Sequence, residues 1–291
     1  MYVSAPNRFV TAGNGVRYAY RRCGALGGPP LVLLQNFRGT LDSWDQALVD
    51  ALAAQRDVVA FDNAGVGLSA GRAARTVVAT AQDTLAFLDA LGLDRVDLLG
   101  FSLGGYVAQE LALRHPARVR RMVLAATAPR GAAGIHGWSA DVLAHVNPER
   151  LLAQDYLYTF FHHTPSSQQS GLEFFGRYIE REQDRDAPVS REAMEAQYEA
   201  VVEWGVPDPA ALQRLADVRQ PTLVTAGDSD RVVPPALAHL LGALIPGAQV
   251  HVYPDAGHGF LFQHHERFAA DVLDFLSSSV HDAQGAENQV T

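Results

Sequence analysis

The sequence has no lysine: all 23 basic residues among its 291 are arginine. A chain without lysine cannot form a Schiff base through a side-chain amine and cannot supply the phosphate-binding lysine of a P-loop. It has a single cysteine, Cys23, which excludes a disulfide within the chain and a cysteine-based metal site. We therefore expect neither a metal nor a cofactor.

Clustered positive charge and long apolar runs are also missing. The net charge is −9 and the arginines are scattered, which argues against binding to DNA or RNA. No apolar run approaches the length of a membrane span, and the start, MYVSAPNRFV, lacks the basic and apolar regions of a secretion signal. These absences predict a cytoplasmic protein that acts on a small molecule, with no nucleic acid and no membrane as partner. They leave a homo-oligomer open.

Two patterns alternate regularly along most of the chain. With 48% hydrophobic and 19% charged residues, the chain can bury one large core. Short apolar runs typical of buried strands occupy residues 29–36, 57–62, 95–101, 119–128, 221–227 and 248–254. Patterns typical of helices occupy residues 42–55, 80–93, 105–115, 234–245 and 265–276. The alternation predicts an α/β fold with a mostly parallel central sheet flanked by helices.

The N-terminal part follows a different pattern. Two strand-like runs within residues 9–24 are joined by Asn14 and Gly15. Asparagine and glycine tolerate positive φ angles and favour a tight hairpin turn. We therefore expect the sheet to begin with an antiparallel pair.

Residues 129–218 interrupt the alternation. They have helical patterns and contain 10 of the chain's 25 aromatic residues. An insertion of this size between two strands predicts a helical lid over a core domain formed by residues 1–128 and 219–279. The polar tail, residues 280–291, is expected to be disordered.

The stretch DLLGFSLGGYVAQE, residues 97–110, passes from strand-like to helical residues through a sharp break with Ser102 at its centre. Gly100 and Gly104 let the backbone bend tightly enough to present the serine hydroxyl above the edge of the sheet. The helix that starts there directs its N-terminal N–H groups at any negative charge beside the serine. This pattern predicts a nucleophile at Ser102.

A serine hydroxyl needs a base to take its proton and a carboxylate to hold that base. His258, in the segment YPDAGHGF, follows the last predicted strand, where a loop reaches the C-terminal edge of the sheet. The preceding strand ends in TLVTAGDSDRVVPP, which offers Asp228 and Asp230 as the carboxylate. The chain order serine, aspartate, histidine agrees with a serine nucleophile on a sheet of this kind.

From about residue 9 to 277 the chain resembles the α/β-hydrolases of the serine type, through its GFSLGG, GDSDRVVP and AGHG segments. The resemblance implies that Asp230 completes a triad with Ser102 and His258, and that Asp228 is a turn residue. A serine at the sharp turn separates the chain from the dehalogenase and epoxide-hydrolase branches, which carry an aspartate there.

The resemblance also implies an oxyanion hole formed by the backbone N–H groups of Phe37 and Leu103. Here the segment QNFRG has Gln35 and Asn36 where relatives typically have His-Gly. Backbone donors survive such changes, and asparagine is the best substitute for glycine if that position needs a positive φ. We expect the oxyanion hole to be intact.

A second departure lies in DNAGVGLSAG, residues 62–71, where Ala64 stands at the position of an arginine that the family often carries. We interpret Gly65 and Gly67 as residues that form turns. The missing arginine either widens or dries the cleft.

Four residues are candidates for binding the substrate. Arg38 lies beside the predicted oxyanion hole, where it is either a partner for a substrate carboxylate or phosphate or a solvated loop arginine. Trp138, Phe160 and Phe161 belong to the lid, whose aromatic side chains either cover the cleft or pack among themselves. An apolar lid favours a substrate with an apolar part.

Three classes of function fit these residues. The complete triad favours a serine hydrolase that cleaves a small ester, thioester or lactone through an acyl-enzyme on Ser102. One alternative is a non-hydrolytic enzyme on the same scaffold, such as a perhydrolase or haloperoxidase, a lyase or a biosynthetic cyclase. The other is a binding module that has lost catalysis, which would normally lack a triad member.

Overall fold

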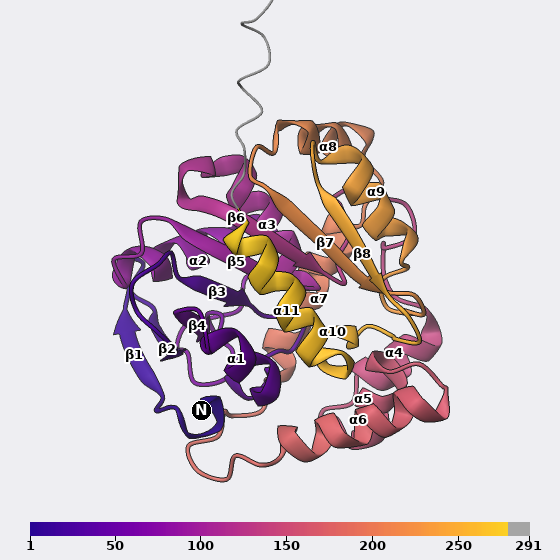
Figure 1. Cartoon of the computed structure of the whole chain (residues 1–291), viewed down its shortest axis with the longest axis horizontal. Coiled ribbons are helices and arrows are strands. Elements are labelled where there is room, and N and C mark those ends of the chain that lie inside the picture. Colours follow the sequence, from indigo (N-terminus) through magenta and orange to yellow (C-terminus); the bar gives the residue numbers. More distant parts are fainter. Residues whose placement is uncertain (279–291) are drawn as a thin grey trace, which may run out of the picture.

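The computed structural model describes residues 1–278 and contains an eight-stranded sheet (Figure 1). The strands are β1 (Arg8–Thr11), β2 (Arg17–Cys23), β3 (Leu31–Leu34), β4 (Val58–Phe61), β5 (Val96–Phe101), β6 (Val119–Ala125), β7 (Thr222–Gly227) and β8 (Gln249–Tyr253). Their order across the sheet is β1-β2-β4-β3-β5-β6-β7-β8. The pairs β1–β2 and β2–β4 are antiparallel, and every other pair is parallel. The predicted α/β fold with a mostly parallel sheet is confirmed.

The sheet begins with the predicted hairpin between β1 and β2. Gly15 has a φ of 79°, and its N–H donates to the carbonyl of Ala12 across the turn. Asn14 does not have a positive φ. Its side-chain amide donates to the Tyr18 hydroxyl at 2.9 Å. The positive φ therefore falls on the glycine, which carries no Cβ penalty.

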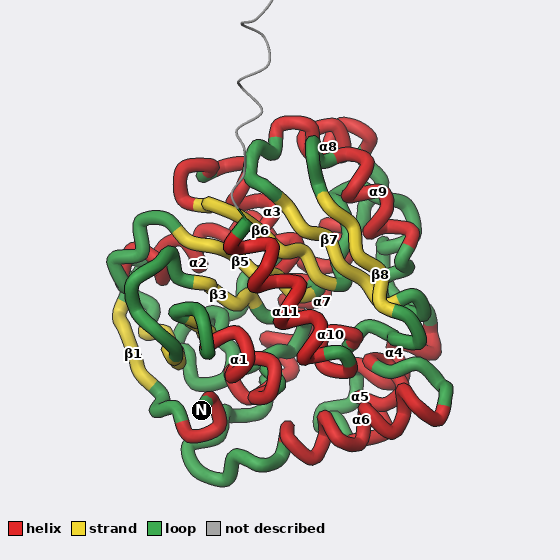
Figure 2. The backbone as a smooth tube through the Cα atoms, in the orientation of Figure 1, coloured by secondary structure: helices red, strands yellow, loops and turns green. Residues whose placement is uncertain are grey.

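Helices cover both faces of the sheet (Figure 2). One face carries α1 (Gln46–Ala53), α10 (Phe260–Gln263) and α11 (His265–Ser277), and the other carries α2 (Val77–Ala90), α3 (Leu103–Arg114) and α9 (Ala236–Leu244). Successive strand residues serve the two faces in turn: Leu33 packs with Leu48 of α1, and Leu34 packs in the cluster that contains Phe87 of α2. Because both faces are covered, β3, β4, β5 and β7 are buried along their whole length.

The inserted segment, residues 129–218, lies between β6 and β7 and is helical. It contains α4 (Ala140–Val146), α5 (Ala153–Phe160), α6 (Pro165–Tyr178), α7 (Arg191–Trp204) and α8 (Pro209–Gln213). The hydroxyls of Thr164 and Ser190 cap α6 and α7 by accepting backbone N–H groups of the first turn. Its division from the core as a separate lid domain stays a prediction.

A strap without regular secondary structure, residues 179–190, joins α6 to α7 and passes the N-terminus of the chain (Figure 1). The Arg181 guanidinium donates to the carbonyls of Val3 at 2.6 Å and Ala5 at 3.0 Å. The Asn7 amide donates to the carbonyl of Asp184 at 2.7 Å. The strap is therefore tied to the first residues of the chain.

A pair of carboxyl groups anchors the same strap to the core. Asp42 and Asp186 exchange hydrogen bonds, each accepting the backbone N–H of the other at 2.8 Å. The Asp186 carboxyl also acts on the fully buried Asp62 through its charge. Burial first, and then the charge of Asp186, raise the pKa of Asp62 well above its usual value. Burial, followed by the charge of Asp42, also raises the pKa of Asp186.

We expect Asp186→Asn to raise the free energy of unfolding by about 1–2 kcal/mol at neutral pH. A carboxyl with a raised pKa in the folded state stabilises the protein at low pH, and this contribution is lost as pH rises through the folded pKa. An asparagine oxygen can keep the bond from Asp42 N–H, and the neutral amide removes the charge that opposes ionisation of Asp62. Denaturant unfolding at low and at neutral pH measures the effect. Asp184→Asn, on the exposed part of the strap, is the control and should leave the pH slope unchanged.

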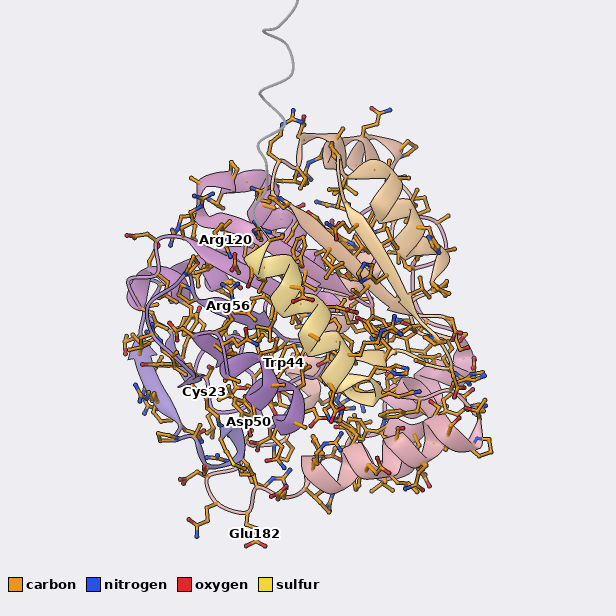
Figure 3. The ribbon with its side chains drawn as sticks, in the orientation of Figure 1. Cys23, Trp44, Asp50, Arg56, Arg120 and Glu182 are labelled. Carbon is orange, nitrogen blue, oxygen red and sulfur yellow. The ribbon has the colours of Figure 1, made fainter. Side chains whose placement is uncertain are left out.

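Many arginines form ion pairs that hold the fold together. Arg120 binds both oxygens of Asp97, and the Arg56 guanidinium lies 3.9 Å from the same carboxylate. Both arginines lie on the face of the sheet covered by α11 (Figure 3). Asp97 is the second residue of β5, so this cluster lies at the opposite end of that strand from Ser102.

Among residues 1–278 no helix is both long and apolar enough to cross a membrane. The tail predicted to be disordered, residues 280–291, lies outside the described residues.

Candidate active site

Ser102 lies where β5 ends and α3 begins, in a backbone conformation that few residues adopt. Its φ is 54° and its ψ is −115°, outside the regions open to most residues with a side chain. Its N–H donates to the carbonyl of Ala125, and its carbonyl accepts from Gly105 N–H and from the Thr127 hydroxyl, each at 2.8 Å. The surrounding structure therefore holds a strained turn in place.

The two glycines that flank Ser102 are required by close packing. A Cβ on Gly100 would lie 2.5 Å from the carbonyl oxygen of Gly104. A Cβ on Gly104 would lie 2.1 Å from the carbonyl oxygen of Leu34, the last residue of β3. Glycine at these positions lets the first turn of α3 approach the end of β3, as the GFSLGG segment predicted.

His258 is paired with Asp230. His258 follows β8, Asp230 follows β7, and His258 Nδ1 lies 2.8 Å from Asp230 Oδ2. Both side chains are buried, and the second oxygen, Oδ1, accepts the N–H groups of Val232 at 2.8 Å and Val233 at 2.9 Å. A carboxylate only accepts, so Nδ1 donates and Nε2 keeps its lone pair. This tautomer is the one a general base requires.

Asp228 has a different role. Its carboxylate accepts the backbone N–H groups of Asp255 at 3.0 Å and Ala256 at 3.2 Å, and the Ser229 hydroxyl at 2.8 Å. Burial opposes ionisation of the Asp228 carboxyl, but these hydrogen bonds outweigh burial and lower its pKa. Asp228 therefore fixes the loop that leads to His258, in agreement with its predicted place in a turn.

The backbone N–H groups of Phe37 and Leu103 are the predicted donors of the oxyanion hole. Phe37 follows β3 and Leu103 is the first residue of α3, the two elements that Gly104 brings together. Among residues 1–278, neither N–H donates to a protein acceptor. An N–H in the first turn of a helix has no partner inside the helix, which leaves that of Leu103 available.

The positive φ of this loop falls on a different residue from the one considered in the sequence. Asn36 does not have a positive φ, whereas Arg38 has a φ of 60°. The Arg38 N–H donates to Gln197 Oε1 of α7 at 2.9 Å, which holds the loop in this conformation. A residue of the inserted segment thus positions the backbone next to Phe37.

The Arg38 side chain binds backbone carbonyls of the inserted segment, and its role in binding a substrate anion stays a prediction. Its guanidinium is half-buried and donates to the carbonyls of Val146 at 2.8 Å, Pro148 at 2.7 Å and Glu149 at 2.8 Å. Burial lowers the pKa of Arg38. With three backbone acceptors, Arg38 ties the loop that contains Phe37 to the end of α4 and to the residues that follow it.

Six of the nine predicted site residues line one cavity, whereas Asp230, Leu103 and Phe161 do not. The empty space of this cavity, counted out to its mouth, is about 620 Å³. Ser102, His258, Phe37 and Arg38 line it together with two of the predicted lid residues, Trp138 and Phe160. Phe161 does not line it; its ring is buried against Phe174, so its assignment to substrate binding is wrong.

The family model described as the alpha/beta hydrolase fold matches residues 29–265. The chain belongs to the α/β-hydrolase family. A solved α/β-hydrolase fold protein from Chitinophaga pinensis is 35% identical, with a TM-score of 0.90, and the match covers 96% of this chain and 99% of that one.

Two curated relatives within the α/β-hydrolase family are hydrolases. The 2-hydroxymuconate semialdehyde hydrolase of Pseudomonas putida is 33% identical over 77% of this chain and 78% of its own. The poly(3-hydroxyalkanoate) depolymerase of Ectopseudomonas oleovorans is 30% identical over 78% of this chain and 77% of its own. These likenesses support hydrolase activity in general.

The cavity of this α/β-hydrolase also contains residues that the sequence did not reveal. They are Asn36, Ser43, His145, Val146, Leu151, Tyr156, Thr159 and Val232. Val232 could have been found, because it follows Asp230 within GDSDRVVP. The residues of α4 and α5 belong to no motif, and only the packing of the inserted helices places them. Within residues 1–278, no three side chains of the types that bind metals gather at one point.

Proposed function

We propose that the protein is a serine hydrolase that cleaves a small ester, thioester or lactone through an acyl-enzyme on Ser102. One arrangement carries the proposal: Ser102 on a strained turn lines the same cavity as His258, whose Nδ1 is held by the buried Asp230. A serine at such a turn beside a histidine with a free Nε2 is the arrangement that activates a hydroxyl as a nucleophile.

In the first half of the reaction, His258 Nε2 takes the proton of Ser102 Oγ as that oxygen attacks the substrate carbonyl carbon. Asp230 stabilises the resulting imidazolium, and the N–H groups of Phe37 and Leu103 donate to the developing oxyanion. The bond to the leaving oxygen or sulfur then breaks, and His258 returns the proton to the leaving group.

In the second half, a water molecule attacks the acyl carbon while His258 Nε2 takes its proton. The bond between the acyl carbon and Ser102 Oγ then breaks, and the proton passes from His258 back to the serine. The acid is released and the serine hydroxyl is restored. In each half of the reaction, His258 accepts one proton and returns it.

The walls of the cavity favour a substrate with an apolar part. Trp138, Val146, Leu151 and Phe160 face it from the inserted segment. Burial of apolar surface is the main source of affinity for such a substrate. The two curated relatives are named for different substrates, so they support the chemistry and not one compound.

Labelling with a fluorophosphonate tests the proposal directly. The reagent should form a stable adduct on Ser102, and a panel of esters, thioesters and lactones should show turnover with at least one class. An intact folded protein that neither reacts with the reagent nor turns over any member of the panel would contradict the proposal. Adduct formation without hydrolysis would indicate non-hydrolytic chemistry in the same cavity.

We expect kcat/KM to rise with the length of an acyl chain by about fourfold per methylene, since each buried methylene contributes ~0.8 kcal/mol, until the cavity is filled. Leu151→Trp should shift the preferred chain to a shorter length, because the indole occupies cavity volume. Leu152→Trp is the matched control, because Leu152 is exposed and does not line the cavity. Initial rates with a series of p-nitrophenyl esters measure both. Equal shifts of the preferred chain length in the two variants would show that the cavity does not determine the specificity for chain length.

A further inference from the structure

A second histidine–aspartate pair faces the cavity from the inserted segment. His145 lies in the last turn of α4, Asp155 lies in the first turn of α5, and His145 Nδ1 is 2.9 Å from Asp155 Oδ1. The His145 ring stacks on Tyr158 with the ring centres 4.0 Å apart. His145 lines the same cavity as Ser102 and His258. The ring is thus held in a fixed orientation at the wall of the proposed active site.

The hydrogen bonds of Asp155 decide which nitrogen of His145 is available. Asp155 is 5% exposed, and its other oxygen, Oδ2, accepts the backbone N–H of Leu152 at 2.8 Å. Because the carboxylate can only accept, Nδ1 of His145 donates to it, and in the neutral imidazole Nε2 then carries the lone pair. Among residues 1–278, His145 Nε2 has no hydrogen-bond partner.

The other polar side chains on this side of the cavity are already occupied. The Tyr156 hydroxyl donates to the Tyr178 hydroxyl at 3.1 Å, and the Thr159 hydroxyl donates to the carbonyl of Asp155 at 2.7 Å. Arg38 donates to three backbone carbonyls. The Tyr156 and Thr159 oxygens keep lone pairs, but each is already in a hydrogen bond, whereas His145 Nε2 is in none within residues 1–278 and is the acceptor we assign to a ligand.

We propose that His145 is a specificity residue whose Nε2 accepts a hydrogen bond from a hydroxyl group of the substrate, away from the bond that is cleaved. The inference rests on the proposed function, because it names a substrate class for the cavity of Ser102: hydroxylated esters with an apolar chain. A binding site built around a hydrogen bond discriminates against analogues that lack the matching group, because its own polar atom is then left unpaired.

The first experiment compares matched substrates. The panel contains p-nitrophenyl octanoate, its monohydroxy positional isomers and the corresponding ketones, with a second series that carries the hydroxyl on the alcohol instead. We expect at least one hydroxy isomer to exceed both its parent and its ketone by about tenfold in kcat/KM, mainly through KM. His145→Leu should reduce this ratio to about one, and His145→Gln, which retains an amide oxygen near the position of Nε2, should keep part of it.

Asp155→Asn provides the sharper test, because it should change His145 Nε2 from a hydrogen-bond acceptor into a donor. The Leu152 N–H can only donate, so the asparagine oxygen must face it and the NH₂ group must face His145 Nδ1. Nδ1 then accepts, and Nε2 carries the hydrogen. The ketone, which can only accept, should gain on the hydroxy substrate in this variant, whereas the wild-type protein prefers the hydroxy substrate.

Controls separate this inference from the proposed function. His136→Leu removes an exposed histidine of the same segment that does not line the cavity, and it should leave the hydroxy-to-ketone ratio unchanged. Fluorophosphonate labelling of Ser102 reports the nucleophile in every variant. If Ser102 reacts but no hydroxy isomer is preferred, or if His145→Leu slows all substrates equally while lowering the melting temperature, the inference is wrong although the proposed function stands. If Ser102 does not react, the proposed function itself fails.

Discussion

Ser102→Ala should abolish turnover, with kcat/KM falling by at least about 10⁴-fold. Every step of the proposed mechanism passes through a bond to Ser102 Oγ, and alanine removes that atom while leaving the backbone unchanged. The hydroxyl makes no hydrogen bond within residues 1–278, so its loss leaves no buried partner unsatisfied. The free energy of unfolding should therefore change by less than about 1 kcal/mol. Steady-state kinetics with the best ester and a thermal unfolding curve measure the two quantities.

Mass spectrometry of the fluorophosphonate adduct provides the control for this variant. Ser43 lines the same cavity and is a second hydroxyl that the reagent can reach. The label should be found on the peptide that contains Ser102 and should disappear in Ser102→Ala. A label that persists on Ser43, or a variant that keeps even a tenth of the activity, would show that another group is the nucleophile.

The sheet could be predicted from the sequence because its strands carry the signal themselves. Both faces are covered, so β3 is apolar along its whole length and β5 is apolar except at Asp97, and both contrast with the amphipathic helices between them. The same regularity allowed the candidate site residues to be located in the sequence. Ser102 directly follows β5, and Asp230 and His258 lie three and five residues after the ends of β7 and β8, so the strands place all three at the same edge of the sheet.

The inserted segment could not be predicted to the same depth. Phe160 and Phe161 are neighbours in the sequence, yet one lines the cavity and the other is buried against Phe174. Which of them faces the substrate depends on how α5 packs on α6 and on the loop of His258, and these are contacts between residues far apart in the chain. Likewise, the acceptors of Arg38 are backbone carbonyls more than a hundred residues away, which no side-chain pattern reveals.

The two aspartates of GDSDRVVP should respond very differently to the same substitution. Asp230→Asn should lower kcat/KM by about 10³–10⁴-fold and change stability little, whereas Asp228→Asn should cost about tenfold or less in rate. The reason lies in what each carboxylate accepts. At Asp230, the N–H groups of Val232 and Val233 can only donate, so an asparagine oxygen must stay with them. The NH₂ group then faces His258 Nδ1 and forces the hydrogen onto Nε2, which can no longer take the proton of Ser102.

At Asp228, the same change affects the backbone of the loop and not the base. An asparagine has one oxygen for the N–H groups of Asp255 and Ala256, which the two carboxylate oxygens now accept separately. One N–H loses its partner, at a cost of about 1–2 kcal/mol in the free energy of unfolding. The melting temperature should therefore fall more for Asp228→Asn, and the rate should fall more for Asp230→Asn. Both quantities should be measured on both variants. If the rate fell more for Asp228→Asn than for Asp230→Asn, Asp230 would not be the carboxylate that orients His258.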